Sequence, residues 1–421
     1  MELLLWGIAA FWLALFTIGM VLWRYRLSLQ PAAPMERGPA GAAFEWPLVS
    51  VLVPARNEEH RVLREAIGAL LRQDYPRLEI LVVNDRSTDR TLEILKEMAR
   101  WDSRLRVIDG EEPPPGWRGK PFALQQALAE ARGEWILAVD ADVIAHPAAV
   151  RTALALARER ALDALSLLPK FEYVSFWDRV VEPQALNLLR LGMLIAAWRE
   201  KRRGARSSEG ARRRRSVHPL ALLSAYVGDP AFTIGAFTLL RREALESIGG
   251  YAAIRGEVLD ETILGMRLKQ FGYRVFAVEG APLVRTPARV TLAEIWEAYS
   301  RSICSAVGRR WLAALVGGGV IVLLAVFPPL VLIGALMEMV RGGSPSVSTV
   351  IPAAVAYVAM TGLSFRLSAA DRPTLLSASL AVLGYAIFAA IAFATPWRLW
   401  SGAGVMWRGR CVYGVRENVS G

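Results

Sequence analysis

Two carboxylates stand one residue apart directly after an apolar run. Asp140 and Asp142 follow the segment 135–139, in which every residue is apolar. In an extended chain, one carboxylate can reach a metal directly while the other acts through a water or holds a sugar hydroxyl. Their oxygens suit Mg²⁺ or Mn²⁺, and such an ion usually also binds substrate phosphates. The pair therefore predicts a divalent-metal site, and a diphosphate leaving group would fit it.

Two more charged residues lie where chemistry of this kind would need them. Asp85 stands at the end of the predicted strand 78–83, and a carboxylate there can accept hydrogen bonds from a uracil imide or from ribose hydroxyls. Lys120 opens a predicted helix, where a cation is unfavourable unless an anion is also present. Lys120 therefore points to a donor diphosphate. An exposed lysine in a proline-rich loop, with no ligand, would give the same sequence pattern.

A second acidic pair, Asp260 and Glu261, precedes a helical pattern that carries Leu264 and Leu268. Adjacent carboxylates at a helix start can simply complement the helix dipole. A direct-displacement sugar transfer also needs a general base that deprotonates the acceptor hydroxyl, and a carboxylate can do this. The residues alone leave these two interpretations equal.

The elements that must position these acids alternate between strand and helix. Apolar runs rich in β-branched residues predict strands, and apolar residues at helical spacing predict the helices between them. This alternation indicates a mostly parallel sheet covered by helices, with ligands at the carboxyl ends of the strands. The expected strands are 48–53, 78–83, 105–108 and 135–139, and the expected helices are 61–72, 91–99 and 122–131.

The composition predicts a membrane protein. Of the 421 residues, 54% are hydrophobic, which is too apolar for a wholly soluble chain. The segment 3–23 carries no charge and matches the roughly 20 residues that span a bilayer. We therefore interpret residues 1–26 as an anchor. Arg24 and Arg26 favour a cytoplasmic location for the chain after them. A linker rich in Pro, Ala and Gly is expected within 27–47.

Three further apolar stretches come after residue 310. They are 311–337, 350–365 and 374–397, and together they form a predicted transmembrane region, 311–397. The middle stretch is short enough to be a tilted span, a re-entrant segment or a buried helix. If all four stretches span, the tail 398–421 lies outside, yet its arginines favour the cytoplasm. Both outcomes stay open.

The net charge of +11 is concentrated in a basic loop, 199–218, which includes the run 212–215. Beside membrane anchors, such a loop fits anionic lipid headgroups better than nucleic acid, and a solvated loop fits equally well. Two cysteines and three scattered histidines exclude a disulfide framework and a zinc-type cluster.

Taken together, the chain resembles family 2 glycosyltransferases of the GT-A fold, from about residue 48 to 310. The closest resemblance is to membrane-bound members associated with hopanoid biosynthesis and to carotenoid glycosyltransferases. The segments that carry it are 53–59, 84–91, 116–120, 140–142 and 254–256.

The resemblance implies an α/β, Rossmann-like GT-A domain over 48–310 that binds a nucleotide sugar. In it, Pro54, Glu58 and Asp85 line the nucleotide pocket. Ala55 and Arg56 belong to the same strand end, and we place them with the nucleotide-sugar site.

For the reacting groups, the resemblance implies that Lys120 lies near the donor and that Asp140 and Asp142 form the metal-binding DxD motif, with Asp140 also near the donor. It further implies inversion at the anomeric carbon, with the base in the acidic pair. Relatives typically have Asp where this chain has Glu261, so Glu261 or Asp260 could be the base, and we favour Glu261.

One motif of processive polysaccharide synthases is incomplete. Arg310 and Trp311 end it as expected, but Val307 stands where Gln is required. Processive synthesis is therefore not expected. Arg301 could contact the diphosphate, and a snorkelling arginine on an interfacial helix explains it equally well.

The resulting prediction is an inverting glycosyltransferase that moves a sugar, from a UDP-sugar by resemblance, onto a lipid such as a hopanoid or carotenoid. It would be multi-pass in the inner (cytoplasmic) membrane, with its catalytic domain in the cytoplasm. A polyprenyl-phosphate acceptor is the alternative within enzymes. A catalytically silent membrane scaffold is the alternative outside them, against which the retained acids argue.

Overall fold

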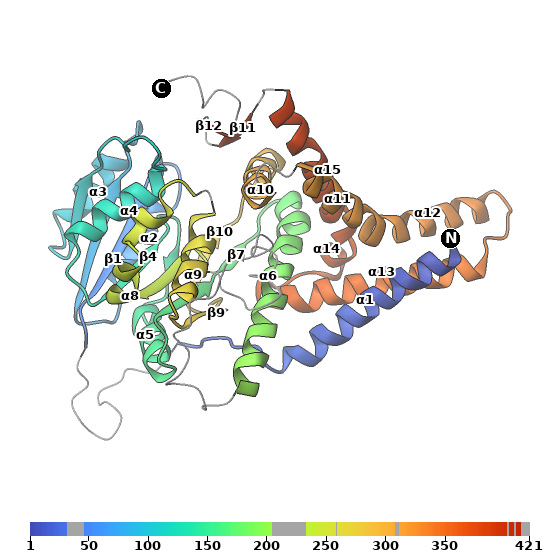
Figure 1. Cartoon of the computed structure of the whole chain (residues 1–421), viewed down its shortest axis with the longest axis horizontal. Helices are drawn as coiled ribbons and strands as arrows, with labels where there is room; N and C mark the ends of the chain where they lie inside the picture. Colours follow the sequence, from blue (N-terminus) through green and yellow to red (C-terminus); the bar gives the residue numbers. More distant parts are fainter. Residues whose placement is uncertain are drawn as a thin grey trace. The chain divides into compact units, whose positions relative to one another are not determined.

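The computed structural model describes residues 1–31, 46–203, 233–257, 259–307, 311–401, 404–407 and 410–413. They group into two compact units (Figure 1). The helical unit takes its residues from 1–26, 173–198 and 288–421, and the sheet unit from 27–172 and 199–287. The predicted linker and most of the basic loop and tail lie outside the described residues.

A seven-stranded sheet forms the centre of the sheet unit. Its order is β3-β2-β1-β4-β8-β6-β9, and within it β8 runs antiparallel to both neighbours while the other pairs are parallel. The order reverses beside β1, because β2 and β3 lie on one side of it and β4 on the other. The strands are β1 (Val49–Ala55), β2 (Leu78–Asn84), β3 (Leu105–Asp109), β4 (Trp135–Val139), β6 (Ala164–Leu168), β8 (Phe237–Arg241) and β9 (Val275–Glu279).

A smaller sheet, β5-β10-β7, and several helices complete the sheet unit. Helix α4 packs on β1 and β2, and α5 packs on β6. The remaining elements are β5 (Ile144–Ala145), β7 (Lys170–Glu172), β10 (Val284–Pro287), α2 (Leu63–Leu71), α3 (Thr91–Ala99), α4 (Gly119–Glu130), α5 (Ala149–Glu159), α8 (Arg242–Ser247), η3 (Gly250–Ile254) and α9 (Asp260–Gln270).

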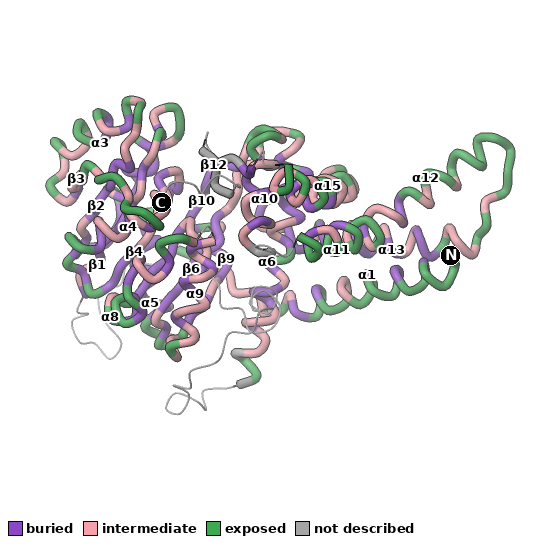
Figure 2. The backbone as a smooth tube through the Cα atoms, turned by 45° about the horizontal axis from the view of Figure 1, so that its top comes forward, coloured by how far each residue is buried: buried purple, intermediate pink, exposed green. Residues whose placement is uncertain are grey.

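The core explains why the strands read as apolar runs. Strands β1, β2 and β4 are buried along most of their length (Figure 2), so nearly every position is apolar instead of alternating. One core cluster joins α4, α8, η3 and α9 to this sheet through residues such as Leu52, Leu124 and Leu264. The predicted mostly parallel sheet with covering helices is confirmed, and helix α3 and strand β4 match their predicted bounds.

The helical unit contains the long apolar segments. Its elements are α1 (Glu2–Trp23), α6 (Phe176–Arg203), α10 (Leu292–Val307), α11 (Trp311–Ile321), the π-helix η4 (Val322–Val326), α12 (Phe327–Val340), α13 (Val347–Leu367), η5 (Ser368–Asp371), α14 (Leu375–Ser379), α15 (Ala381–Trp400), β11 (Val405–Trp407) and β12 (Arg410–Tyr413).

Five helical segments among the described residues are long and apolar enough to cross a membrane. Four correspond to the predicted stretches, and the fifth is 176–199 in α6, which the sequence did not suggest as a span. The short middle stretch, 350–365, belongs to the 21-residue helix α13, whose length is sufficient for a span.

A local irregularity shows how the sequence shapes this unit. Pro328 has no backbone N–H, so it cannot donate to the carbonyl of Leu324 four residues earlier. The indole of Trp12, on α1, donates to that carbonyl at 2.7 Å. The chain forms the π-helix η4 at this place. Helix α1 is thereby tied to η4 as well as packed along α13.

Candidate active site

The predicted metal-binding pair lies where the strand order reverses. Leu52 of β1 pairs with Ala138 of β4, so Pro54 stands level with Asp140 two residues further on. Asp140 and Asp142 follow β4, and a turn closes between them as the N–H of Val143 donates to the carbonyl of Asp140 at 3.1 Å. Such a reversal point is where open α/β sheets bind their ligands.

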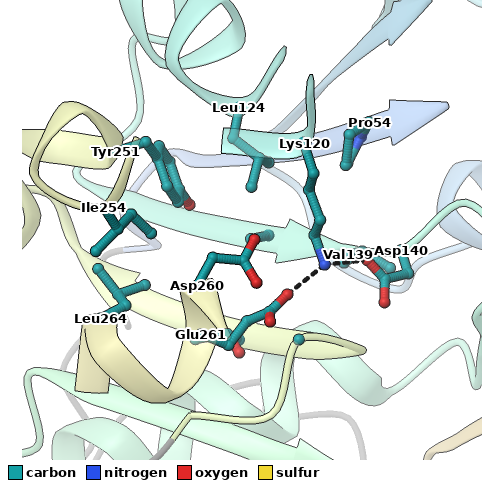
Figure 3. A pocket seen from close by; sticks show the side chains of 13 residues that line it. Pro54, Lys120, Leu124, Val139, Asp140, Tyr251, Ile254, Asp260, Glu261 and Leu264 are labelled. Atoms are coloured by element: carbon teal, nitrogen blue, oxygen red, sulfur yellow. Dashed lines mark hydrogen bonds and ion pairs between the residues drawn. The ribbon is translucent and has the colours of Figure 1, made fainter. Parts of the chain in front are cut away.

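Lys120 joins the two predicted acidic groups. It lies in the first turn of α4, and its Nζ donates to Oδ1 of Asp140 at 2.7 Å and to Oε1 of Glu261 at very short range (Figure 3). Burial favours the neutral amine, but the charges of Asp140, Glu261 and Asp260 outweigh it and raise the pKa of Lys120 well above its ordinary value. Lys120 is therefore a cation between the predicted metal-binding acid and the predicted base.

The acidic pair opens α9, and its two members differ in charge. Burial and the neighbouring Glu261 carboxylate raise the pKa of Asp260 well above its ordinary value. Burial acts in the same sense on Glu261, but the Lys120 ammonium and a hydrogen bond from Asp260 outweigh it and lower the pKa of Glu261 to about 2. These surroundings thus favour the neutral form of Asp260 and the charged form of Glu261.

Residues just before β8 hold Glu261 in place. The hydroxyl of Thr233 donates to the backbone carbonyl of Glu261 at 2.5 Å. A Cβ at Gly235 would collide with the Glu261 side chain, which would then have to move from its present position. Gly235 could not be predicted from the sequence, because only this long-range approach distinguishes it from any other glycine.

Asp142 forms an ion pair with Arg61, which was not among the residues predicted from the sequence. Nη1 of Arg61 donates to Oδ2 of Asp142 at 2.8 Å and lies 3.7 Å from Oε2 of Glu58. Arg61 stands just before α2, 81 residues away from Asp142 in the chain. Both members of the predicted DxD motif are therefore paired with basic side chains.

The loops after β1 and β2 are cross-linked into one structure. Asn57 and Arg86 both adopt left-handed backbone conformations, with φ of 52° each. The side-chain oxygen of Asn57 accepts a hydrogen bond from the N–H of Thr88 at 2.8 Å, and the hydroxyl of Ser87 accepts one from the N–H of Asn57 at 3.1 Å. The predicted nucleotide loops are thus built as a unit.

Asp85 is held within this unit by several groups. Arg86 donates to its Oδ1 at 3.0 and 3.1 Å, and Nη1 of Arg56 lies 3.5 Å from its Oδ2. Its carboxylate also lies against the start of α4, where a Cβ at Gly119 would collide with it. Asp85 therefore faces the N-terminus of the helix that carries Lys120.

The donor set around Asp140 fits the expected divalent metal. Among the described residues, no three acidic, histidine or cysteine side chains are grouped as a closed metal site. Mg²⁺ commonly uses only one or two carboxylates together with substrate phosphates. Burial raises the pKa of Asp140 to about 6, with nearby Glu261 and Asp142 adding to the effect. A bound cation would offset the repulsion between carboxylates that lie this close together.

One cavity brings together much of the predicted site. Its lining includes Pro54, Lys120, Asp140, Asp260 and Glu261 from the predicted residues. Ala55, Arg56, Glu58, Asp85 and Asp142 are placed on the adjoining loops and strand ends. Arg301 lies on α10 in the helical unit, so its predicted contact with the diphosphate stays a prediction.

Two family models match the chain. "Glycosyl transferase family 2" matches residues 50–249, and "Glycosyl transferase family group 2" matches residues 191–400. The chain belongs to the family 2 glycosyltransferases. The family 2 membership and the GT-A fold class predicted from the sequence are confirmed, whereas the resemblance to hopanoid and carotenoid enzymes stays a prediction. The described acids and Lys120 lie within the matched residues.

Relatives share only part of their length with this chain. A probable glycosyltransferase of Bacillus subtilis is 46% identical over 23% of this chain and 23% of its own. A beta-monoglucosyldiacylglycerol synthase of Synechocystis is 31% identical over 36% and 33%, and a dolichyl-phosphate beta-glucosyltransferase of Trichomonas vaginalis is 39% identical over 27% and 37%. The matches thus span about a quarter to about a third of these relatives.

Solved structures are similar at low identity. A mannosyltransferase from Pyrobaculum calidifontis, in complex with GDP-Man and Mn²⁺, is 18% identical with a TM-score of 0.48, covering 94% of this chain and 99% of that one. The Staphylococcus aureus protein TarS, residues 1–349 with UDP, is 19% identical with a TM-score of 0.36, covering 86% and 95%.

Proposed function

We propose that this chain is an inverting glycosyltransferase that moves a sugar from a nucleotide sugar, a UDP-sugar, to a lipid acceptor in the membrane, such as a hopanoid or carotenoid. The observation that carries the proposal is the single cavity lined by Asp140, Lys120 and the acidic pair. Donor-side and acceptor-side groups of a displacement reaction meet there, in a chain with several helices that can cross a membrane.

In the proposed reaction, the acceptor oxygen attacks the anomeric carbon as the bond from that carbon to the diphosphate breaks. Attack from the opposite side inverts the configuration, and the acceptor proton passes to Glu261. Mg²⁺ or Mn²⁺ held by Asp140 and Asp142 would neutralise the diphosphate. Asp85 would bind the uracil or ribose, and Lys120 would bind the phosphates.

Lys120 links donor binding to the base. While Lys120 is bound to Glu261, the carboxylate is stabilised and is a weak base. A diphosphate that takes over the ammonium would release Glu261 and let its pKa rise toward the ordinary value. A base activated only when the donor is present would limit unproductive proton transfer.

The catalytic sheet is proposed to face the cytoplasm, because Arg24 and Arg26 follow α1. Helix α6 then does not act as a simple crossing. Strands β6 and β8 are neighbours in one sheet, so the chain must be on the same side of the membrane before and after α6. The intervening segment 204–236 contains Arg212–Arg215 and Asp229 and offers no charge-free stretch of about 20 residues for a return.

Contacts within the helical unit support this placement of α6. Arg190 of α6 forms a buried ion pair with Asp371, at 2.5 Å, and Asn187 accepts a hydrogen bond from Ser368 at 3.0 Å. Both partners follow α13 directly. If α13 returns the chain to the cytoplasm, these contacts support a position of α6 at the cytoplasmic membrane surface, next to the end of α1, where Trp23 packs in the same cluster as Leu194.

The proposed class of acceptor is supported by the helices that can cross a membrane and by the names of two relatives. One relative is named for a diacylglycerol product and another for dolichyl phosphate. A polyprenyl phosphate is therefore the second candidate acceptor. Both candidates present an oxygen nucleophile at the membrane surface, and they differ in whether that oxygen already carries a negative charge.

The test uses the full-length protein in liposomes with a panel of UDP- and GDP-sugars. One set of liposomes contains hopanoids and hydroxylated carotenoids, and another contains polyprenyl phosphates. We expect a glycosylated hopanoid or carotenoid of inverted anomeric configuration, identified by mass spectrometry and NMR. Transfer only to polyprenyl phosphate would replace the acceptor, and no transfer in either set would refute the proposed function.

A further inference from the structure

Tyr251 places a polar group inside the cavity without a partner for it. The residue belongs to η3 and is 1% exposed, and its ring packs in the core cluster with Leu124 and Leu264. Its hydroxyl has no hydrogen-bond partner among the described residues. A buried hydroxyl without a partner is unfavourable, and phenylalanine would fill the same space without that cost. The hydroxyl therefore calls for a ligand that supplies the partner.

The backbone fixes the ring in this position. Gly249 and Gly250, with φ of +95° and +64°, adopt conformations that side chains rarely allow. The side-chain oxygen of Gln125, on α4, accepts a hydrogen bond from the N–H of Ala252 at 3.2 Å. Helix α4 also carries Lys120. The segment that carries the phenol is thus held against the helix that carries the cation of the site.

The space in front of the hydroxyl is small and has two kinds of wall. In Figure 3 the Tyr251 hydroxyl points toward the interior of the cavity, near Asp260. Leu124, Ile254 and Leu264 form the apolar wall, and the charged groups form the other. The cavity holds about 10 Å³, which is about what one water needs. It can accept a single hydroxyl-sized group.

The position of the Tyr251 hydroxyl relative to the charged residues of the cavity identifies that ligand. Within the proposed function, on which this inference rests, the diphosphate binds at Lys120 and Asp140 and the acceptor proton goes to Glu261. The anomeric carbon must lie between these groups. The substituents of the sugar ring are then the polar groups available to Tyr251, since the reacting oxygen of the acceptor is already engaged by Glu261.

We propose that the Tyr251 hydroxyl forms a hydrogen bond with one hydroxyl group of the sugar being transferred, and that it selects the donor sugar. The apolar wall around it leaves any other polar substituent unsatisfied. A site built to bind a substrate hydroxyl discriminates strongly against an analogue that lacks it.

The experiment compares the wild type with Tyr251→Phe, both full-length, in the liposome transfer assay. The donors are the best UDP-sugar of the panel and its singly deoxygenated analogues, and UDP binding is measured separately. With the normal donor, Y251F should lose about tenfold or more in kcat/KM. One deoxy donor should react at least as slowly with the wild type, and Y251F should show no further loss with it, because the same hydrogen bond is already absent. UDP binding should not change.

A matched variant, Tyr75→Phe, controls for the loss of a phenol hydroxyl. Tyr75 lies outside the cavity lining and donates to the carbonyl of Pro47 at 2.5 Å. Y75F should leave sugar selection unchanged and lower the thermal midpoint, whereas Y251F should keep the midpoint or raise it.

Three results would overturn the inference and leave the proposed function standing. They are an active wild type with an unchanged Y251F, equal further losses of Y251F on every deoxy donor, and weakened UDP binding that accounts for the whole loss. A wild type that transfers none of the sugars would refute the proposed function, and this inference with it.

Discussion

Replacing Glu261 by Gln tests the proposed base most directly. The amide keeps the shape of the side chain and removes only the proton acceptor. Positioned general-base catalysis is typically worth about 10²- to 10⁴-fold, so E261Q should lose kcat by about that factor. The assay is single-turnover transfer to the lipid acceptor, in which product release does not limit the observed rate.

Donor binding should change little in this variant. Lys120 loses one carboxylate partner but keeps Asp140 at 2.7 Å. Both Lys120 and Glu261 are partly exposed, at 34% and 25% of their side chains. Ion pairs in such surroundings contribute about 0.2–1 kcal/mol, which corresponds to at most about fivefold in affinity. Titration of the full-length protein with the donor checks this.

Asp260→Asn separates the two members of the pair. Because the raised pKa favours the protonated form of Asp260 beside Glu261, the asparagine amide can donate in its place, and the loss should stay below about tenfold. Glu97→Gln, an exposed acid paired with Arg64, is the matched control and should have no effect. A larger loss in D260N than in E261Q would make Asp260 the base. If neither variant slowed transfer tenfold, the acidic pair would only complement the helix dipole.

Four further outcomes are expected. EDTA or Asp142→Ala should abolish transfer without unfolding the chain, since the diphosphate then loses the ion that would neutralise its charge; full activity in EDTA would contradict the metal site. Gly235→Ala should lower kcat by displacing Glu261 while UDP still binds, as single-turnover rates and titration would reveal. Trp12→Phe should lower the stability of the detergent-solubilised protein by about 1 kcal/mol, because the Leu324 carbonyl loses its donor, which thermal unfolding measures. A chain lacking the anchor and everything after α10 should hydrolyse donor slowly at best, and efficient lipid glycosylation without detergent would disprove this.

The sheet could be predicted because buried parallel strands have a simple sequence pattern, a nearly continuous run of apolar residues. Strands β1, β2 and β4 are apolar at almost every position, and each is followed by polar residues. The carboxyl ends of neighbouring parallel strands must meet at one edge. The presence of Pro54 and Asp140 at one edge of the sheet was therefore predictable, whereas the pairing of β1 with β4 comes from the structure.

Long-range partners could not be predicted in this way. Arg61 lies 81 residues from Asp142, and nothing in its neighbours distinguishes it from other exposed arginines on helices. Tyr251 reads as an ordinary core aromatic until its hydroxyl is seen without a partner. Helix α6 was not recognised as an apolar segment because Asp178, Glu182 and Arg190 interrupt it. The partners of Glu182 and Arg190 lie more than 100 residues away in the chain, at 107 and 181 residues.

The paired cations explain how so many acids can share one site before a substrate arrives. Lys120 and Arg61 neutralise Asp140, Glu261 and Asp142 at positions where a divalent ion would otherwise be needed. When a metal and a donor bind together, the ion can take over the carboxylates of the DxD pair, and the two basic side chains become available to the diphosphate. The charge of the site then stays nearly balanced through binding.

Neither ligand alone is well accommodated, because the metal alone would compete with Lys120 and Arg61, and the diphosphate alone would meet the acids. Metal and UDP should therefore bind cooperatively, each tightening the other by the same factor. Titrations of UDP with and without Mn²⁺, and of Mn²⁺ with and without UDP, measure this coupling. Equal UDP affinities in the two conditions would show that the cations do not exchange partners as argued.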